Sequence, residues 1–283
     1  MSPYIVHDID PFFVRFASES TIGGIHWYGV CYAISFIIAL FMMNSYSKRE
    51  KSPLSSDQNT LLLSYVIIGV IAGGRLGYML MYNFNGLIHD PMSTFRIWEG
   101  GMASHGGFVG VAIAVWLFCK IHEMSILKVN DICSSVAPIG LLLGRIGNFI
   151  NGELYGKIAY VPWAIIFPQS DPKALVVNEI PPRHPSQLYE GFAEGLLLFI
   201  YMQLRFWLSR GTAEGQLTGE FLIGYSIARI ATEFYRETDV PMICGMSRGQ
   251  FLSIFLFIIG VVLIFIARKR FRYFRRSHGM PMR

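Results

Sequence analysis

The chain has 283 residues, of which 53% are hydrophobic and 15% are charged, and it carries a formal net charge of +5. Its mean hydropathy is +0.43. Soluble globular domains usually have about a quarter of their residues charged. The composition therefore excludes an ordinary soluble domain and indicates an integral membrane protein.

Seven segments are apolar and long enough to cross a bilayer, which takes about 20 helical residues. They cover residues 25–46, 58–82, 101–119, 129–150, 186–207, 216–236 and 249–267. We expect an all-α polytopic membrane protein with about seven transmembrane helices, forming a single membrane domain over residues 1–283. Lys and Arg are more frequent in the loops on the same side as the basic tail, residues 268–283, so we expect a cytoplasmic C-terminus and an N-terminus outside.

Residues 8–20 precede the first span. Their apolar side chains, among them Phe12, Phe13 and Phe16, have a spacing that suits one face of a short interfacial helix. Tyr28 follows at the outer end of the first span, where an aromatic belt at the membrane surface is the default explanation.

Two ionisable residues occupy glycine-rich surroundings in the next two spans. Arg75 lies near the outer end of the second span, where a lipid headgroup contact, snorkelling to the interface or pairing with Glu99 are all open. His105 lies between two glycine pairs at the outer end of the third span. Proton exchange near neutral pH and simple packing are both compatible with this position.

Residues 144–156 close the fourth span and are the most informative part of the chain. They place Arg145, Asn148, Asn151 and Glu153 among four glycines. Hydrocarbon tolerates such groups only where they face protein or a wet cavity. Arginine suits a phosphate, and glycine lets the backbone approach a ligand closely. We therefore expect a site for a lipid headgroup at this membrane boundary.

The longest segment without a predicted span covers residues 151–187, on the predicted outer side, and it is rich in proline. Long loops without helical periodicity are often functional. We interpret it as an extracytoplasmic head segment inserted between the fourth and fifth spans. It is too short for a core of its own and forms a small cap.

The fifth and sixth spans also carry ionisable groups. Glu190 and Glu194 share one helical face, and Tyr225, Arg229 and Glu233 share another at i, i+4 and i+8. Pairing with a glutamate lowers the free-energy cost of placing an arginine within the membrane. A polar cavity and a structural ion pair are both compatible with these patterns, and paired carboxylates also suit a proton-relaying transporter.

Several patterns are absent from the sequence. It contains no Walker loop, no dinucleotide glycine fingerprint and no aspartate-rich diphosphate motif. The four cysteines are scattered, which disfavours a zinc site. We therefore expect no metal, no cofactor and no nucleic-acid partner, and we expect the basic tail to contact anionic membrane lipids.

Residues 144–156 resemble the diagnostic pattern of the bacterial phosphatidylglycerol–prolipoprotein diacylglyceryl transferase family, in which Gly-Arg, Gly-Asn-Phe, Asn, Glu and a final Gly keep a fixed spacing. Similar blocks run through most of the chain, at residues 25–29, 73–83, 98–107, 183–190 and 224–236.

The resemblance implies a reaction and its site. The diacylglyceryl group of phosphatidylglycerol moves to the lipobox cysteine thiol of a preprolipoprotein, a thioether forms and glycerol phosphate leaves. The family's catalytic residues are carried over to His105, Arg229 and Tyr28. Its substrate-binding residues are carried over to Arg145, Asn148, Asn151, Glu153, Gly156, Tyr225 and Glu233.

The resemblance also implies a multi-pass protein of the bacterial inner membrane with its active site towards the outer leaflet. Three other functions are alternatives. A secondary transporter would use the carboxylates as coupling groups, but the internal symmetry common in transporters is not evident. A structural scaffold would not need so many ionisable groups at depth. A phospholipid headgroup transferase is closest in chemistry.

Overall fold

The structure is a computed structural model, and it describes residues 3–16, 23–174, 176–208, 213–237, 242 and 245–277. It is mostly helical and divides into two compact units. The first unit comprises Met1–Arg15, Gly24–Ala39 and Cys133–Arg283, and the second unit comprises Phe16–Gly23 and Leu40–Ile132.

Each of the seven predicted apolar segments contains a helix. These helices are α1 (Trp27–Lys48), α2 (Ser56–Met81), α4 (Ser104–Ile121), α5 (Ile126–Ile150), the consecutive segments α6 (Ser186–Glu190), η5 (Gly191–Leu197) and α7 (Leu198–Leu208), α8 (Gln216–Glu233) and α9 (Arg248–Ser277). Among the described residues, α1, α2, α5 and α9 are long and apolar enough to cross a membrane, and residues 106–121 form a shorter apolar helix. The chain is thus a multi-pass membrane protein, and the number of its spans and their orientation stay predictions.

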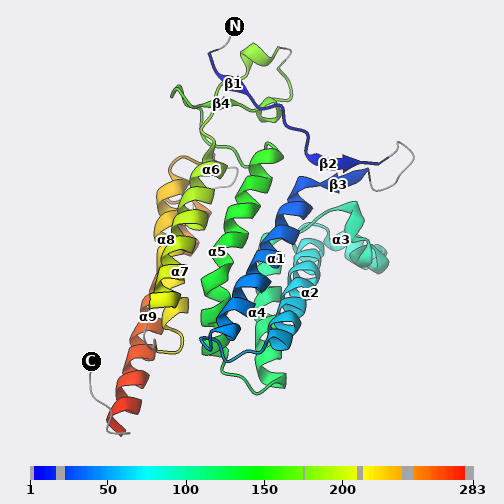
Figure 1. Ribbon diagram of the computed structural model, residues 1–283. Helices are drawn as coiled ribbons and strands as arrows, with labels where there is room; N and C mark the ends of the chain where they lie inside the picture. Colours follow the sequence, from blue (N-terminus) through cyan, green and yellow to red (C-terminus); the bar gives the residue numbers. More distant parts are fainter. Residues whose placement is uncertain are drawn as a thin grey trace. The chain divides into compact units, whose positions relative to one another are not determined.

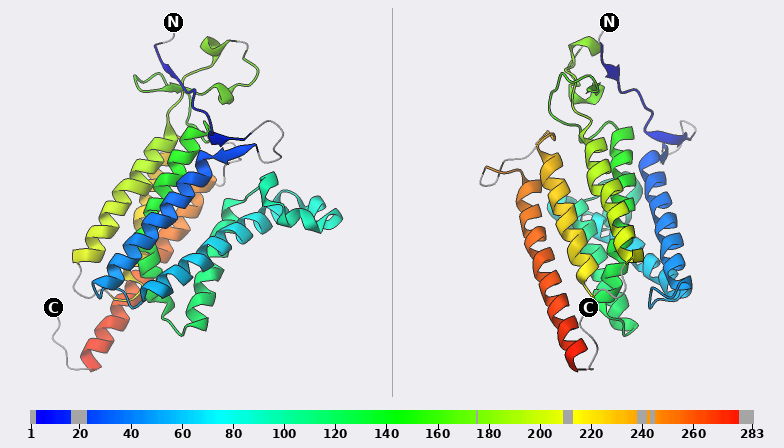
Figure 2. Two further views of the ribbon diagram at one scale, coloured as in Figure 1. Left: turned by 45° about the vertical axis from the view of Figure 1, so that its right-hand side comes forward. Right: turned by 60° about the vertical axis from the view of Figure 1, so that its left-hand side comes forward.

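The second unit is built on close packing of α2 against α4 (Figure 2). A Cβ atom at Gly73 would lie 2.3 Å from the carbonyl oxygen of Gly106, so only glycine allows the two helices to come this close. The third apolar segment begins at about residue 101 in the sequence. Helix α4 begins later because Gly100 and Gly101 both have positive φ angles, 78° and 79°, which end regular helix.

Short helices connect α2 to α4. They are α3 (Phe84–His89), η1 (Pro91–Phe95) and η2 (Ile97–Glu99).

Arg75 of α2 is 4% exposed and links α2 to this connection by hydrogen bonds. Its guanidinium donates to backbone carbonyl oxygens of Ser93, Thr94, Gly100 and Gly101. The side chain thus points into the protein and does not snorkel. The alternative pairing with Glu99 involves a side chain outside the described part of the structure.

In the first unit, α7, α8 and α9 run side by side (Figure 1). The segment η5 is a π-helix, an irregularity that often marks functional sites. Its glycines bring it directly onto α5, since a Cβ atom at Gly195 would lie 2.7 Å from the Cα atom of Leu142. This contact places the carboxylates before and within η5 beside the C-terminal half of α5.

The N-terminal segment forms strands. Strand β2 (Phe12–Arg15) pairs antiparallel with β3 (Gly24–His26). The prediction of a short helix within residues 8–20 is therefore wrong for residues 12–15, because pairing with β3 overrides the helical spacing of the phenylalanines. Residues 17–20 lie outside the described part of the chain.

The predicted head segment folds together with the N-terminus. Strand β1 (Ile5–Val6) pairs in parallel with β4 (Ile165–Ile166), and two short helices follow, η3 (Pro168–Ser170) and η4 (Val177–Glu179). Figure 2 shows this part beyond the ends of α5 and α6. At the other end of the chain, α9 continues to Ser277, so the basic tail is helical from residue 268 to 277.

Candidate functional site

The site begins with Arg145, which lies more than one turn before the end of α5. Its Nε atom lies 2.8 Å from Oε2 of Glu190, and its Nη2 atom lies 3.4 Å from Oε2 of Glu194. Both carboxylates come from the α6–η5 segment. The close approach of η5 to α5 at its glycines makes these pairs possible.

Arg229 of α8 reaches the same two carboxylates. Its Nη1 atom lies 3.0 Å from Oε2 of Glu190 and 3.4 Å from Oε1 of Glu194, while its Nη2 atom lies 2.7 Å from Oε2 of Glu233. The i, i+4 pairing of Arg229 with Glu233 that the sequence predicts is thus present. Arg236, just after α8, adds a contact of 3.4 Å from its Nη1 atom to Oε1 of Glu190.

These six residues form what we call the arginine–glutamate cluster: Arg145, Arg229, Arg236, Glu190, Glu194 and Glu233. With all groups ionised, its three guanidinium and three carboxylate charges cancel. Burying a carboxylate is costly unless cations and hydrogen bonds compensate it. The three arginines provide this compensation around Glu190 and Glu194.

The solvent-accessible part of the cluster is cationic. The side chains of Glu190 and Glu194 are 1% and 0% exposed, whereas those of Arg145, Arg229 and Arg236 are 17%, 11% and 18% exposed. An approaching group thus reaches the arginine side chains of the cluster more readily than the carboxylates of Glu190 and Glu194. Such an arrangement suits an anion that accepts charge-assisted hydrogen bonds.

Two further α8 side chains border the cluster. The Tyr225 phenol is close enough to Glu194, Arg229 and Arg145 for electrostatic interaction. The hydroxyl of Thr232 donates a hydrogen bond of 3.3 Å to Oε1 of Glu194. The predicted face of Tyr225, Arg229 and Glu233 is therefore directed towards this cluster.

A second polar group lies one turn further along α5. Asn148 donates from Nδ2 to Oε1 of Glu153, over 2.8 Å, and its side chain also hydrogen-bonds the Tyr28 hydroxyl. Tyr28 rests on α5 at Gly147, where a Cβ atom would lie 2.6 Å from the tyrosine ring. Tyr28 also contacts the hydroxyl of Tyr32 at 3.2 Å. The structure thus brings Tyr28, from the first span, to Asn148 and Glu153 of the motif at residues 144–156.

Asn151 and Gly156 occupy different surroundings. Oδ1 of Asn151 is buried without a hydrogen-bond partner among the described residues. Gly156 is enclosed by protein, since a Cβ atom there would lie 2.5 Å from the Tyr235 carbonyl oxygen and 2.7 Å from Cβ of His184. Close packing explains the need for glycine at this position, and its role in substrate binding stays a prediction. Burial lowers the pKa of the neighbouring His184 imidazole.

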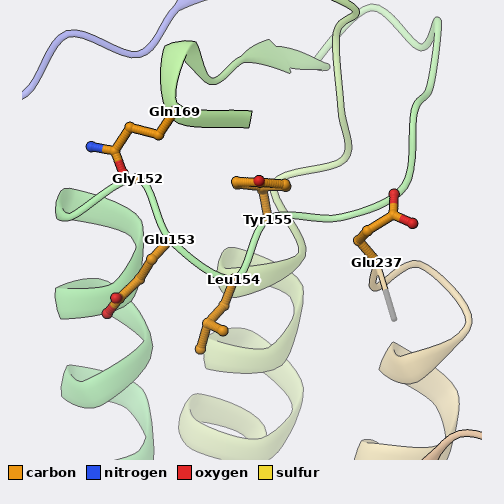
Figure 3. A pocket seen from close by; sticks show the side chains of 6 residues that line it. All are labelled: Gly152, Glu153, Leu154, Tyr155, Gln169 and Glu237. Atoms are coloured by element: carbon orange, nitrogen blue, oxygen red, sulfur yellow. The ribbon is translucent and has the colours of Figure 1, made fainter. Parts of the chain in front are cut away.

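A cavity of about 210 Å³ opens beyond the end of α5 (Figure 3). Its lining residues are Gly152, Glu153, Leu154, Tyr155, Gln169 and Glu237. Glu153 and Glu237 come from different sides of it. Arg183 holds Glu237 by an ion pair of 2.7 Å and lies over the ring of Tyr155. The cavity is thus polar and adjoins the Asn148–Glu153 pair.

His105 is the second residue of α4 and belongs to the second unit. Its side chain lies outside the described part of the structure. The roles of general base or packing residue that the sequence left open therefore stay predictions.

Sequence reasoning missed three members of the cluster as site residues: Glu190, Glu194 and Arg236. The i, i+4 spacing of the two glutamates is visible in the sequence, but it is compatible with a polar cavity, a structural ion pair or a proton-relaying transporter. Arg236 follows Arg229 by seven residues, two helical turns, which is a signal that was available. Which helices face one another decides the pairing, and spacing within one helix does not contain that information.

These features define a multi-pass membrane protein with a cluster of partly exposed arginines paired with buried carboxylates. A family model described as prolipoprotein diacylglyceryl transferase matches residues 19–266. A relative from Methylococcus capsulatus, named phosphatidylglycerol–prolipoprotein diacylglyceryl transferase, is 43% identical over 275 residues, covering 95% of this chain and 97% of the relative.

Relatives with the same name give similar values. One from Bradyrhizobium diazoefficiens is 41% identical over 280 residues, covering 95% of this chain and 96% of its own. One from Legionella pneumophila is 43% identical over 243 residues, covering 84% and 91%. The chain belongs to the prolipoprotein diacylglyceryl transferase family.

Proposed function

We propose that this chain transfers the diacylglyceryl group of phosphatidylglycerol to the lipobox cysteine of a preprolipoprotein, as the names of its relatives describe for them. The thiolate sulfur attacks the glyceryl carbon that bears the phosphate ester. A carbon–sulfur bond forms, the carbon–oxygen bond breaks, and glycerol phosphate leaves with the bonding electron pair.

The observation that carries this proposal is the convergence of two partly exposed arginine side chains, Arg145 and Arg229, on the buried carboxylate of Glu190. The phosphate diester has one negative charge, and the departing phosphate monoester develops a second. Fixed guanidinium groups aimed at that phosphate stabilise the transition state more than the bound substrate, which is the requirement for catalysis. Arg145 and Arg229 are suited to this task, and Glu190, Glu194 and Glu233 hold their side chains in place.

The attacking thiol must lose its proton. A free cysteine thiol has a pKa of about 8.5, so a base accelerates the reaction at neutral pH. His105 is our proposed base, and Tyr28 is the alternative. Asn148 is hydrogen-bonded to Tyr28 and donates to Glu153, and these three side chains could orient the reacting groups in this scheme. The chain needs no cofactor or metal in this scheme.

The proposed setting is the bacterial inner membrane, with about seven spans, the N-terminus outside and the site towards the outer leaflet. The head segment then covers the extracytoplasmic side, where a preprolipoprotein presents its cysteine. The substrates of the enzyme at this site are phosphatidylglycerol and the lipobox segment, and its helices are surrounded by membrane lipids.

The test uses the purified full chain in vesicles, with a lipobox peptide that contains one cysteine. Vesicles of phosphatidylglycerol should yield a peptide heavier by one diacylglyceryl group and an equal amount of glycerol phosphate. Vesicles of phosphatidylethanolamine, and a peptide with serine in place of the cysteine, are the controls. Diacylglyceryl peptide without glycerol phosphate release, or no modified peptide from phosphatidylglycerol, would exclude the proposal.

A further inference from the structure

The C-terminal end of α5 carries both polar groups of the site, so what holds this end matters for the reaction. The last carbonyl groups of a helix have no partner within the helix. The carbonyl oxygen of Phe149 accepts a hydrogen bond from the Gly152 amide at 2.9 Å. It also contacts Nε2 of His7 at 2.7 Å. Because a carbonyl oxygen can only accept, Nε2 of His7 carries the proton and donates it.

His7 comes from the far N-terminus and is firmly held. It is buried, and its ring stacks on Phe167 at a centroid distance of 5.3 Å and meets the edge of Phe149 at the same distance. Its backbone amide donates to the carbonyl oxygen of Ile166 at 2.8 Å, which continues the pairing of β1 with β4. The pairing of β1 with β4 thus places the imidazole of His7 at the C-terminal end of α5.

The turn next to His7 decides where Glu153 lies. Gly152 has a φ of 65° and Leu154 a φ of 58°, both in the left-handed region. The Glu153 backbone amide donates a hydrogen bond to the carbonyl oxygen of Asn148 at 3.1 Å. Because the Glu153 carboxylate also accepts a hydrogen bond from the Asn148 side chain, both the backbone and the side chain of Glu153 are held by Asn148. A Cβ atom at Gly152 would lie 3.2 Å from the His7 ring, so the imidazole abuts this turn.

We propose that His7 is a positioning residue for the transfer reaction. By donating to the Phe149 carbonyl group it fixes the turn at residues 151–154 and thereby the orientation of Asn148 and Glu153. This inference rests on the proposed function, because it takes Asn148 and Glu153 as part of the transfer site.

The test compares two substitutions of nearly equal shape, His7→Gln and His7→Met. The glutamine amide nitrogen can replace Nε2 as a donor, whereas methionine has no donor. In the vesicle assay, His7→Gln should keep kcat within about threefold of the original chain. His7→Met should lower kcat by about tenfold or more with little change in the KM for peptide, because small misplacements of reacting groups can cost up to ~10²-fold.

The matched control is His122→Met. His122 ends α4 in the second unit and its ring also packs on a phenylalanine, Phe118. This variant should keep full activity, which shows that losing a ring-stacked histidine is not enough to cause the defect. If His7→Met does not yield folded protein, His7→Phe replaces it, because it keeps a ring against Phe167 and also lacks the donor.

Hydrogen exchange of the amides at residues 151–153 separates this inference from the proposed function, since it needs no substrate. These amides should exchange faster in His7→Met than in His7→Gln. Equal activity losses in both variants, a rise in peptide KM alone, or unchanged exchange in His7→Met would each overturn the role of His7. If the original chain fails to transfer lipid, the proposed function fails, and the exchange result still reports on the turn.

Discussion

Arg145 of α5 and Arg229 of α8 meet at one carboxylate oxygen: Oε2 of Glu190 lies 2.8 Å from Nε of Arg145 and 3.0 Å from Nη1 of Arg229. A shared partner fixes the spacing of the two guanidinium groups before any substrate binds. In the proposed reaction, the guanidinium N–H groups that the carboxylates do not engage would donate to one anion with several acceptor oxygens. This arrangement favours forked hydrogen bonds to phosphate over a single point contact.

Arg145→Lys should therefore lose most of the transfer activity while the protein still inserts and folds. Lysine keeps the charge, but it cannot make the planar fork to phosphate or hold Glu190 through an Nε–H group. Removing one well-placed donor from a charge-stabilising site costs about 10²–10³-fold in rate. Initial rates of purified Arg145→Lys measure this loss. Near-normal transfer would remove phosphate binding from the role of Arg145.

Arg229 and Glu233 should act as one unit. Glu233→Gln removes the 2.7 Å ion pair and should weaken the use of phosphatidylglycerol. Because Glu233 acts through Arg229, combining it with Arg229→Ala should add little to the loss from Arg229→Ala alone. A double-mutant cycle on kcat/KM for phosphatidylglycerol measures the coupling. Losses that multiply independently would argue against the proposed orientation of Arg229 by Glu233.

His105→Gln tests the proposed general base. A general base contributes about 10²–10⁴-fold, so the rate at neutral pH should fall by that order while lipid binding is kept. The deficit should shrink as pH rises through about 8.5, because the cysteine thiol then ionises without help. A pH series of single-turnover transfer measures this. Arg145→Ala is the control, since raising pH does not restore a phosphate ligand. A His105→Gln deficit that stays constant with pH would make Tyr28 the better candidate.

Arg75→Met should destabilise the protein, because Arg75 satisfies several buried carbonyl groups of the α2–α4 connection. Leaving buried acceptors unpaired costs about 1–3 kcal/mol, and the thermal unfolding midpoint in detergent reports it. Arg96→Met is the matched control, because Arg96 pairs with Asp90 at the surface, where ion pairs contribute about 0–1 kcal/mol. Equal shifts for both variants would show that the carbonyl contacts of Arg75 do not stabilise this connection.

The helices could be predicted from the sequence because a membrane span is encoded locally, as a long apolar run. The failures have physical causes. Phe12 and Phe13 have a spacing that suits a helix, but their segment pairs with β3, and strand pairing is decided by a distant partner. The sequence predicts the start of α4 only to within a few residues, because the positive φ angles at Gly100 and Gly101 depend on the connection bound to Arg75.

The candidate site was predicted in part. Arg145, Asn148 and Glu153 lie in one short motif, and Arg229 and Glu233 are an i, i+4 pair, so local spacing was sufficient. Contacts between helices were not predictable from spacing. Glu190 shows this, because its sequence neighbours give no sign that arginines from α5 and α8 converge on it. The hydrogen bond between His7 and the Phe149 carbonyl group could not be predicted for the same reason, since residues 7 and 149 are distant in sequence.

The most direct test of the central claim is the fate of one oxygen atom. Phosphatidylglycerol is prepared with ¹⁸O at the ester oxygen that joins the diacylglyceryl carbon to phosphorus, and it is supplied to the purified chain with the lipobox peptide. Transfer by attack of sulfur on carbon breaks the carbon–oxygen bond, so all of the label should appear in the released glycerol phosphate and none in the lipidated peptide. Label retained on the diacylglyceryl product would mean that the phosphorus–oxygen bond breaks, which would contradict the proposed reaction and favour a phospholipid headgroup transferase.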